Sequence, residues 1–183
     1  MNDLPRLTLL GLVCAVAQFA HAASPSPYAG QQSREIKALS SAEQADLLAG
    51  KGMGLAKAAE LNGYPGPAHV LELAGDLALS DAQRERTQAL WQAMATRAKA
   101  LGQQVLEAER ELDALFASRQ VTRERLSAQL DRIGALQAQL RAAHLDAHLE
   151  QARILTPEQA TRYAALRGYA DAAGSHGAGA HKH

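Results

Sequence analysis

Apolar residues recur at alternating spacings of four and three along two neighbouring stretches of the chain. In the first, near residues 81–118, the stripe consists of Leu90, Met94, Ala98, Leu101, Val105, Ala108, Leu112 and Leu115. In the second, near residues 122–153, it consists of Leu126, Leu130, Ile133, Leu136 or Gln137, Leu140, His144 and Ala147. Such a stripe lies on one face of an α-helix and must be buried against another element. Because only a short break at residues 118–121 separates the stretches, the pattern predicts two long helices that form an antiparallel hairpin.

The pattern Leu-(Ser/Thr)-x-x-Gln occurs twice and marks two helix starts. The copies are Leu79-Ser80-Asp81-Ala82-Gln83 and Leu155-Thr156-Pro157-Glu158-Gln159. In each, the hydroxyl can cap the helix, the glutamine at the third helical position can bond back to the cap, and the leucine can pack against the first turn. Residues equidistant from the hairpin tip lie opposite each other. Both motifs are therefore expected at the open end of the hairpin.

Shorter helices are expected on both sides of the hairpin, which makes the predicted fold all-α. The expected helices cover about residues 41–48, 55–61, 69–77 and 157–169. Ser41 and Gln44 fit a capping box at the start of the first of these helices. The glycines at positions 50, 52 and 54 indicate a break after it. Met53 within this break, and Trp91 on the long helix, are interpreted as core residues.

The first 22 residues have the pattern of a secretory signal peptide. Arg6 precedes an apolar run over residues 7–20, and Ala20-His21-Ala22 offers small residues for cleavage. Cys14, the single cysteine, would leave with this peptide, so the mature chain would contain no thiol. The predicted location is the periplasm, without stable membrane insertion, since no later segment is long and apolar enough to span a bilayer.

The predicted organisation follows from these segments. It comprises a signal peptide (1–22), a leader with short helices (23–67), the helical hairpin domain (68–170) and a disordered histidine-containing tail (171–183).

Composition supports helices and gives no electrostatic argument for a nucleic-acid partner. Apolar residues make up 47% of the chain, many of them alanine, while aromatic residues make up only 4%. Such a chain favours close-packed helices over a β-sandwich. Lys plus Arg and Asp plus Glu each number 19, so the formal net charge is zero. A balanced chain lacks the excess positive charge with which proteins bind a phosphate backbone.

The two motifs, bracketing a long helical hairpin behind a signal peptide, resemble those of the LTxxQ-motif periplasmic family. This family includes Spy/CpxP-like chaperones and ZraP/CnrX-like heavy-metal sensor and resistance proteins. The resemblance covers about residues 80–169, and Ser80 stands where threonine is usual, a change that preserves the cap. It implies an all-helical, often dimeric cradle with a concave surface. The implied roles are ATP-independent binding of unfolded clients, metal binding, or control of a membrane-bound sensor.

Two histidines of the second long helix are candidate metal ligands. His144 and His148 are spaced i,i+4, so their imidazoles share one face and could bind one Zn²⁺ or another divalent transition metal. Pairing across the hairpin places them near Trp91 and Met94, and the Met94 thioether could add a soft ligand, as resemblance to a metal sensor suggests. Two imidazoles are too few for a tight site, so Asp146, Met94 or a dimer partner would have to contribute. The alternative is that both histidines are partly buried in the helix interface.

Three further histidines lie near the end of the chain, in a segment rich in small residues. They are His176, His181 and His183. Such a segment could wrap around a borderline metal, and the resemblance to ZraP-like proteins invites a zinc interpretation. Ordering a flexible tail around an ion would keep its affinity modest.

No set of residues predicts catalysis. Glu107, Glu109 and Glu111 alternate along a helix and therefore point in different directions. The glycines around Lys51 lack the spacing of a phosphate-binding loop. We therefore expect a binding protein and not an enzyme.

Two functions remain open from the sequence. The first is an envelope-stress chaperone or adaptor of the Spy/CpxP type that acts as a homodimer on unfolded periplasmic proteins or a membrane sensor protein. The second is a heavy-metal sensor or binding protein of the CnrX/ZraP type, for Zn, Ni, Co or Cu.

Overall fold

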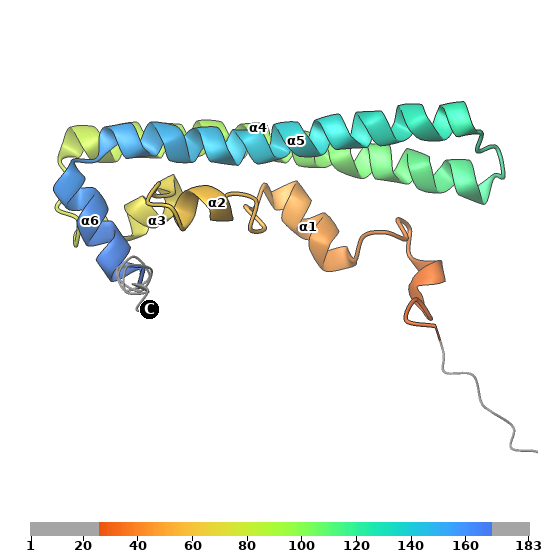
Figure 1. The fold of residues 1–183 in the computed structure, drawn as a ribbon, viewed down its shortest axis with the longest axis horizontal. Coiled ribbons are helices and arrows are strands. Elements are labelled where there is room, and N and C mark those ends of the chain that lie inside the picture. Colours follow the sequence, from red (N-terminus) through yellow and green to blue (C-terminus); the bar gives the residue numbers. More distant parts are fainter. Residues whose placement is uncertain (1–25, 170–183) are drawn as a thin grey trace, which may run out of the picture. The chain divides into compact units, whose positions relative to one another are not determined.

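The computed structural model describes residues 26–169, and every regular element within them is helical (Figure 1). The elements are a 3₁₀ turn (Gln31–Ser33), α1 (Ser41–Ala49), α2 (Lys57–Glu60), α3 (Pro67–Glu72), α4 (Asp81–Ala117), α5 (Arg123–Ile154) and α6 (Pro157–Leu166). The predicted all-α class is thereby confirmed. The expected signal peptide and the tail histidines His176, His181 and His183 lie outside the described residues. No helix within residues 26–169 has the length and apolar character needed to cross a membrane.

The chain divides into two compact units, one ending at Gln32 and one beginning at Ser33. The described part of the first unit, residues 26–32, consists of turns and the start of the 3₁₀ stretch. All further structural description concerns the second unit.

Helices α4 and α5 form the predicted antiparallel hairpin, with bounds within one residue of those expected. The Thr122 hydroxyl accepts a hydrogen bond from the Arg125 backbone N–H at 3.3 Å and so caps α5. In the tight turn before it, Arg119 adopts a left-handed backbone conformation with φ of 57°. The tip thus reverses the chain within a few residues, which brings the two apolar stripes face to face.

The core lies between the two long helices over only part of their length. Its buried members on the hairpin are Ala98, Leu101, Val105, Leu106, Ala108, Ile133, Leu136, Leu140 and Ala143. Leu136 is buried and Gln137 exposed, which resolves the alternative left open by the sequence. Leu130, expected in the core, is 50% exposed. The expectation was wrong because the short helices pack nearer the open end (Figure 1), so that no residue from 109 to 132 is buried.

Helix α1 starts one position earlier than the sequence suggested. Its capping box uses Ser40 and Glu43, with the Ser40 N–H donating to Glu43 Oε2 at 2.8 Å and the Glu43 N–H donating to Ser40 Oγ at 3.2 Å. The predicted pair of Ser41 and Gln44 was wrong because a Glu at the third helical position closes the box as well as a Gln.

Helix α1 packs directly on the backbone of α4. A Cβ atom placed on Gly102 would lie 2.1 Å from the Leu47 carbonyl oxygen. Glycine at position 102 is therefore what lets the two helices approach so closely.

The remaining short helices are shorter than expected. Helix α2 covers only four residues. Helix α3 covers six, because residues 73–78 form consecutive turns that end at Ala78, which has a φ of 49°. Helix α6 ends at Leu166 instead of Tyr169, since Gly168 takes a left-handed conformation with φ of 72° just after it.

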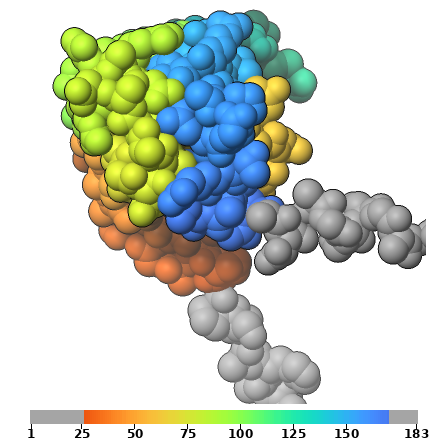
Figure 2. All heavy atoms as spheres, turned by 90° about the vertical axis from the view of Figure 1, so that its left-hand side faces the viewer, coloured from red at the N-terminus to blue at the C-terminus, as the bar shows by residue number. Residues whose placement is uncertain are grey.

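Both Leu-(Ser/Thr)-x-x-Gln motifs lie at the open end of the hairpin, as predicted. Ser80 and Thr156 form complete capping boxes with Gln83 and Gln159. Leu79 and Leu155 are buried together in a second core cluster. Figure 2 views this end and shows the start of α4 (yellow-green) beside α6 (blue).

Candidate metal-binding pocket

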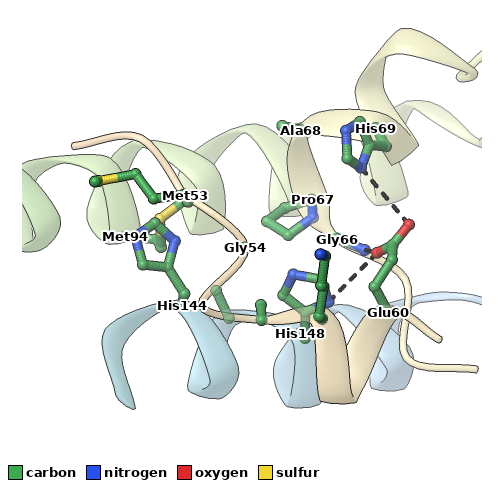
Figure 3. Close-up of a pocket in the computed structure, with 14 residues that line it drawn as sticks. Met53, Gly54, Glu60, Gly66, Pro67, Ala68, His69, Met94, His144 and His148 are labelled. Carbon is green, nitrogen blue, oxygen red and sulfur yellow. Dashed lines mark hydrogen bonds and ion pairs between the residues drawn. The ribbon is translucent and has the colours of Figure 1, made fainter. Parts of the chain in front are cut away.

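A cavity of about 380 Å³ lies against the hairpin near its open end (Figure 3). Its walls come from the glycine-rich loop before α2, from the start of α3, and from facing turns of α4 and α5. The residues with side chains able to bind a ligand are Met53, Lys57, Glu60, His69, Met94, His144 and His148. The cavity therefore brings the predicted His144, His148 and Met94 together, and it adds side chains that no pattern in the sequence singled out.

His148 is oriented by a backbone carbonyl. Its Nδ1 lies 2.7 Å from the Tyr64 oxygen, which can only accept, so Nδ1 carries the proton and donates. A ring with its proton on Nδ1 alone carries its lone pair on Nε2, the form in which imidazole binds a metal. A carbonyl that fixes the ring in this way is the usual outer partner of a metal-binding histidine. Gly66 packs against the ring, since a Cβ there would lie 3.0 Å from His148 Nε2.

His144, one turn earlier on α5, is only 4% exposed. Among the described residues, its Nε2 atom has no hydrogen-bond partner. Burial lowers the pKa of the His144 imidazole, and the nearby His148 lowers it further. Both effects favour the neutral form of the His144 ring. A buried nitrogen without a partner is unfavourable by about 1–3 kcal/mol, so this position suits a group that gains a partner from a ligand.

Two methionines complete this side of the cavity. Met94 on α4 lies next to His144, as expected from pairing across the hairpin (Figure 3). Trp91 does not line the cavity and is 37% exposed. Its interpretation as a core residue was therefore wrong, and so was that of Met53, which is 45% exposed. Met53 lies in a loop between two glycines, has a positive φ of 45° and lines this cavity.

Glu60 joins α2 to α5 and α6, a role that the sequence did not suggest. Its carboxylate accepts hydrogen bonds from the Tyr163 hydroxyl at 2.5 Å and from the Gly66 N–H at 3.1 Å. The Nδ1 atoms of His148 and His69 lie 3.6 and 3.7 Å away. With its side chain only 11% exposed, this carboxylate is surrounded by donors that hold it in place.

The oxygen ligand considered from the sequence does not reach the site. Asp146 is absent from the cavity wall, and its Oδ2 lies 3.5 Å from Arg97 Nη1 on the neighbouring face of the hairpin. Within residues 26–169, no three side chains of the His, Cys, Asp and Glu types are grouped closely enough to hold one ion. Besides the imidazoles, the cavity wall contains the thioethers of Met53 and Met94 and the carboxylate of Glu60.

Comparison with known protein families gives a match to the heavy-metal resistance family over residues 55–162. The match covers more than half of the chain and includes both motifs, both long helices and most of the cavity wall. Neither the curated proteins nor the solved structures give a significant match. The extent of the family match confirms the resemblance found in the sequence. The chain belongs to the heavy-metal resistance family, within the Spy/CpxP/ZraP-like LTxxQ group.

Proposed function

We propose that this protein is an exported heavy-metal-binding protein whose ion binds in the cavity at His144 and His148. The observation that carries the proposal is the placement of these two imidazoles in one cavity. Both line one cavity from successive turns of α5, and the Tyr64 carbonyl orients the His148 ring through Nδ1. Membership of the heavy-metal resistance family supports the same role.

Ion binding also accounts for the burial of His144. An unpartnered ring nitrogen inside a helix pair weakens the fold, and proteins keep such groups where a function needs them. A bound cation would supply the missing partner. Because an imidazole must be neutral to coordinate an ion, the lowered pKa of His144 favours the form that can bind it.

Calorimetric titration of the mature protein with Zn²⁺, Ni²⁺, Co²⁺ and Cu⁺ tests the proposal. We expect binding of at least one of these ions, and loss of that binding in the H144A/H148A double variant. The matched control is H69A, because His69 lines the same cavity. Unchanged binding in the double variant would contradict the proposal. Loss of binding only when residues 174–183 are removed would move the site to the histidine-containing tail.

A second candidate function is the binding of unfolded clients, as in Spy/CpxP-like proteins. An apolar cavity of about 530 Å³ lies between the hairpin and the segment before α2, with walls that include Leu39, Leu55 and Val105. Near the hairpin tip, Phe116 and Leu130 are half exposed. These surfaces could hold apolar segments of a client. The test is aggregation of a reduced client without ATP, where no suppression at equimolar protein would exclude this function.

We further propose that the protein acts in the periplasm as a homodimer and has a binding role without catalysis. Its partners would be unfolded periplasmic proteins or a membrane sensor protein. The tip-proximal third of the hairpin, residues 109–132, has no buried side chain and is the surface expected to pair with a second copy. Sedimentation of the mature protein as a monomer at micromolar concentration would contradict the dimer.

A further inference from the structure

Both methionines of the described chain line the same cavity. The whole sequence contains only three methionines, at positions 1, 53 and 94. Met53 comes from the glycine-rich loop and Met94 from the middle of α4, yet both line the cavity that His144 lines (Figure 3). Two thioethers and an unpartnered ring nitrogen thus share one wall.

The conformation of Met53 indicates that its position is maintained for a reason other than packing. A positive φ of 45° is unfavourable for a residue with a Cβ, by about 1 kcal/mol or more, and glycine would avoid this penalty. Its side chain is also 45% exposed, so burial offsets little of that cost. If the Met53 sulfur binds a ligand in the cavity, this function explains why methionine occupies a strained position.

The cavity offers nitrogen and sulfur donors, while its carboxylate is already engaged. Glu60 accepts hydrogen bonds from the Tyr163 hydroxyl and the Gly66 N–H, so an ion could recruit it only by breaking them. Thioether sulfur is a soft donor that favours Cu⁺, whereas Zn²⁺, Ni²⁺ and Co²⁺ draw more on imidazole, carboxylate and water. The absence of carboxylate charge from the ligand set also suits a monovalent ion.

From this donor set we infer that the pocket is a monovalent copper site in which Met53, Met94 and His144 bind Cu⁺, with His148 as a further nitrogen ligand. The inference rests on the proposed metal-binding function and names the ion that the same site selects. Met53, 45% exposed, is the most exposed of these four residues, whereas the Nε2 atom of His144 is buried.

Anaerobic competition between the mature protein and the chromophoric Cu⁺ chelator bicinchoninate tests the inference. In the M53L/M94L variant, leucine keeps the volume of methionine and removes the sulfur. We expect this variant to bind Cu⁺ at least about tenfold more weakly, which corresponds to about 1.4 kcal/mol. H69Q should retain wild-type affinity, because His69 lies in the same wall without being a ligand in this arrangement. An unchanged Cu⁺ affinity in M53L/M94L would overturn the inference.

X-ray absorption of selenomethionine-labelled protein provides a readout that altered packing cannot imitate. If the thioethers bind the ion, the Cu⁺-loaded protein shows copper–selenium scattering at the copper edge. Loaded protein without such scattering would overturn the inference.

The two proposals fail in different ways. Cu⁺ binding that needs His144 and His148 but not the methionines would leave the metal-binding function standing and remove the thioether site. Binding of a divalent ion without any binding of Cu⁺ would have the same consequence. Absence of binding for all of these ions, or binding unaffected in H144A/H148A, would remove the proposed function itself.

Discussion

Gln83 and Gln159 bind each other through reciprocal amide hydrogen bonds of 2.8 and 3.1 Å. Each Nε2 also donates to a backbone carbonyl, that of Ile154 for Gln83 and that of Leu77 for Gln159. Each Oε1 also accepts the backbone N–H of its own helix cap. The two motifs therefore act as one unit, which ties the start of α4 to the start of α6.

Replacing either glutamine by alanine should destabilise the protein by about 2–3 kcal/mol, since each substitution breaks both bonds between the two amides and removes the side-chain partner of one backbone carbonyl and one helix-cap N–H. The double variant should lose clearly less than the sum of the single losses, because the bonds between the two amides are already broken by the first substitution. Urea unfolding measures all three. Q92A, at an exposed position of α4, is the matched control. Additive losses would show that the two amides act independently.

Gly102→Ala should lower the free energy of unfolding by about 2 kcal/mol or more, because the new Cβ would collide with the Leu47 carbonyl and push α1 off α4. Gly134→Ala on α5 is the matched control. A Cβ there meets no atom within 4 Å, so the higher helix propensity of alanine should stabilise the protein by about 0.5–1 kcal/mol. Thermal unfolding of the two variants measures the contrast. Equal effects would contradict the close approach of α1.

His144→Leu should leave the metal-free protein as stable as the wild type or stabilise it by about 1 kcal/mol, since it replaces an unpartnered buried nitrogen by an apolar group of similar size. The same variant should lose any rise in melting temperature caused by the bound ion. His148→Leu provides the contrast, because losing the bond to Tyr64 should destabilise the metal-free protein. A large loss of stability in His144→Leu would mean that its imidazole has a structural role.

Tyr163 should make the protein sensitive to alkali. Burial, followed by its hydrogen bond to Glu60, raises the pKa of the Tyr163 hydroxyl well above its ordinary value. Above about pH 10 the unfolded chain releases this proton while the folded protein keeps it, so stability falls by up to about 1.4 kcal/mol per pH unit. Tyr163→Phe should flatten this dependence and lower stability at neutral pH.

The measurement for Tyr163 is the urea midpoint at several values of pH from about 9 to 11. The exposed Tyr28 offers a control substitution, Tyr28→Phe, which keeps the Tyr163 hydroxyl. Parallel curves for wild type and Tyr163→Phe would contradict the assignment.

Features set by local spacing could be predicted from the sequence, whereas those set by distant contacts could not. The capping boxes at Ser80 and Thr156 need only neighbours within one turn, and the hairpin needs only periodicity. Their pairing at the open end followed from equal helix rise. The sequence also brought Met94 to the two histidines of α5, because that pairing uses the same rule.

The rest of the site depends on chain segments that carry no periodic signal. Glu60 is a single carboxylate in a four-residue helix, and its partners Tyr163 and Tyr169 lie more than a hundred residues further along the chain. Met53 resembled a core residue by composition, yet its position depends on the backbone between two glycines. Leu130 satisfied the stripe pattern but found no third helix to cover it.

The uneven distribution of buried side chains along the hairpin implies a gradient of local unfolding. Near the motifs, a core cluster and the glutamine pair hold together the turn before α4, the start of α4, the end of α5 and the start of α6. Backbone amides there should exchange with solvent only through global opening. Towards the tip, where residues 109–132 lack buried side chains, small fluctuations should suffice. An ion in the cavity would therefore reside in the more rigid part of the hairpin, and the third nearest the tip would remain adaptable for docking.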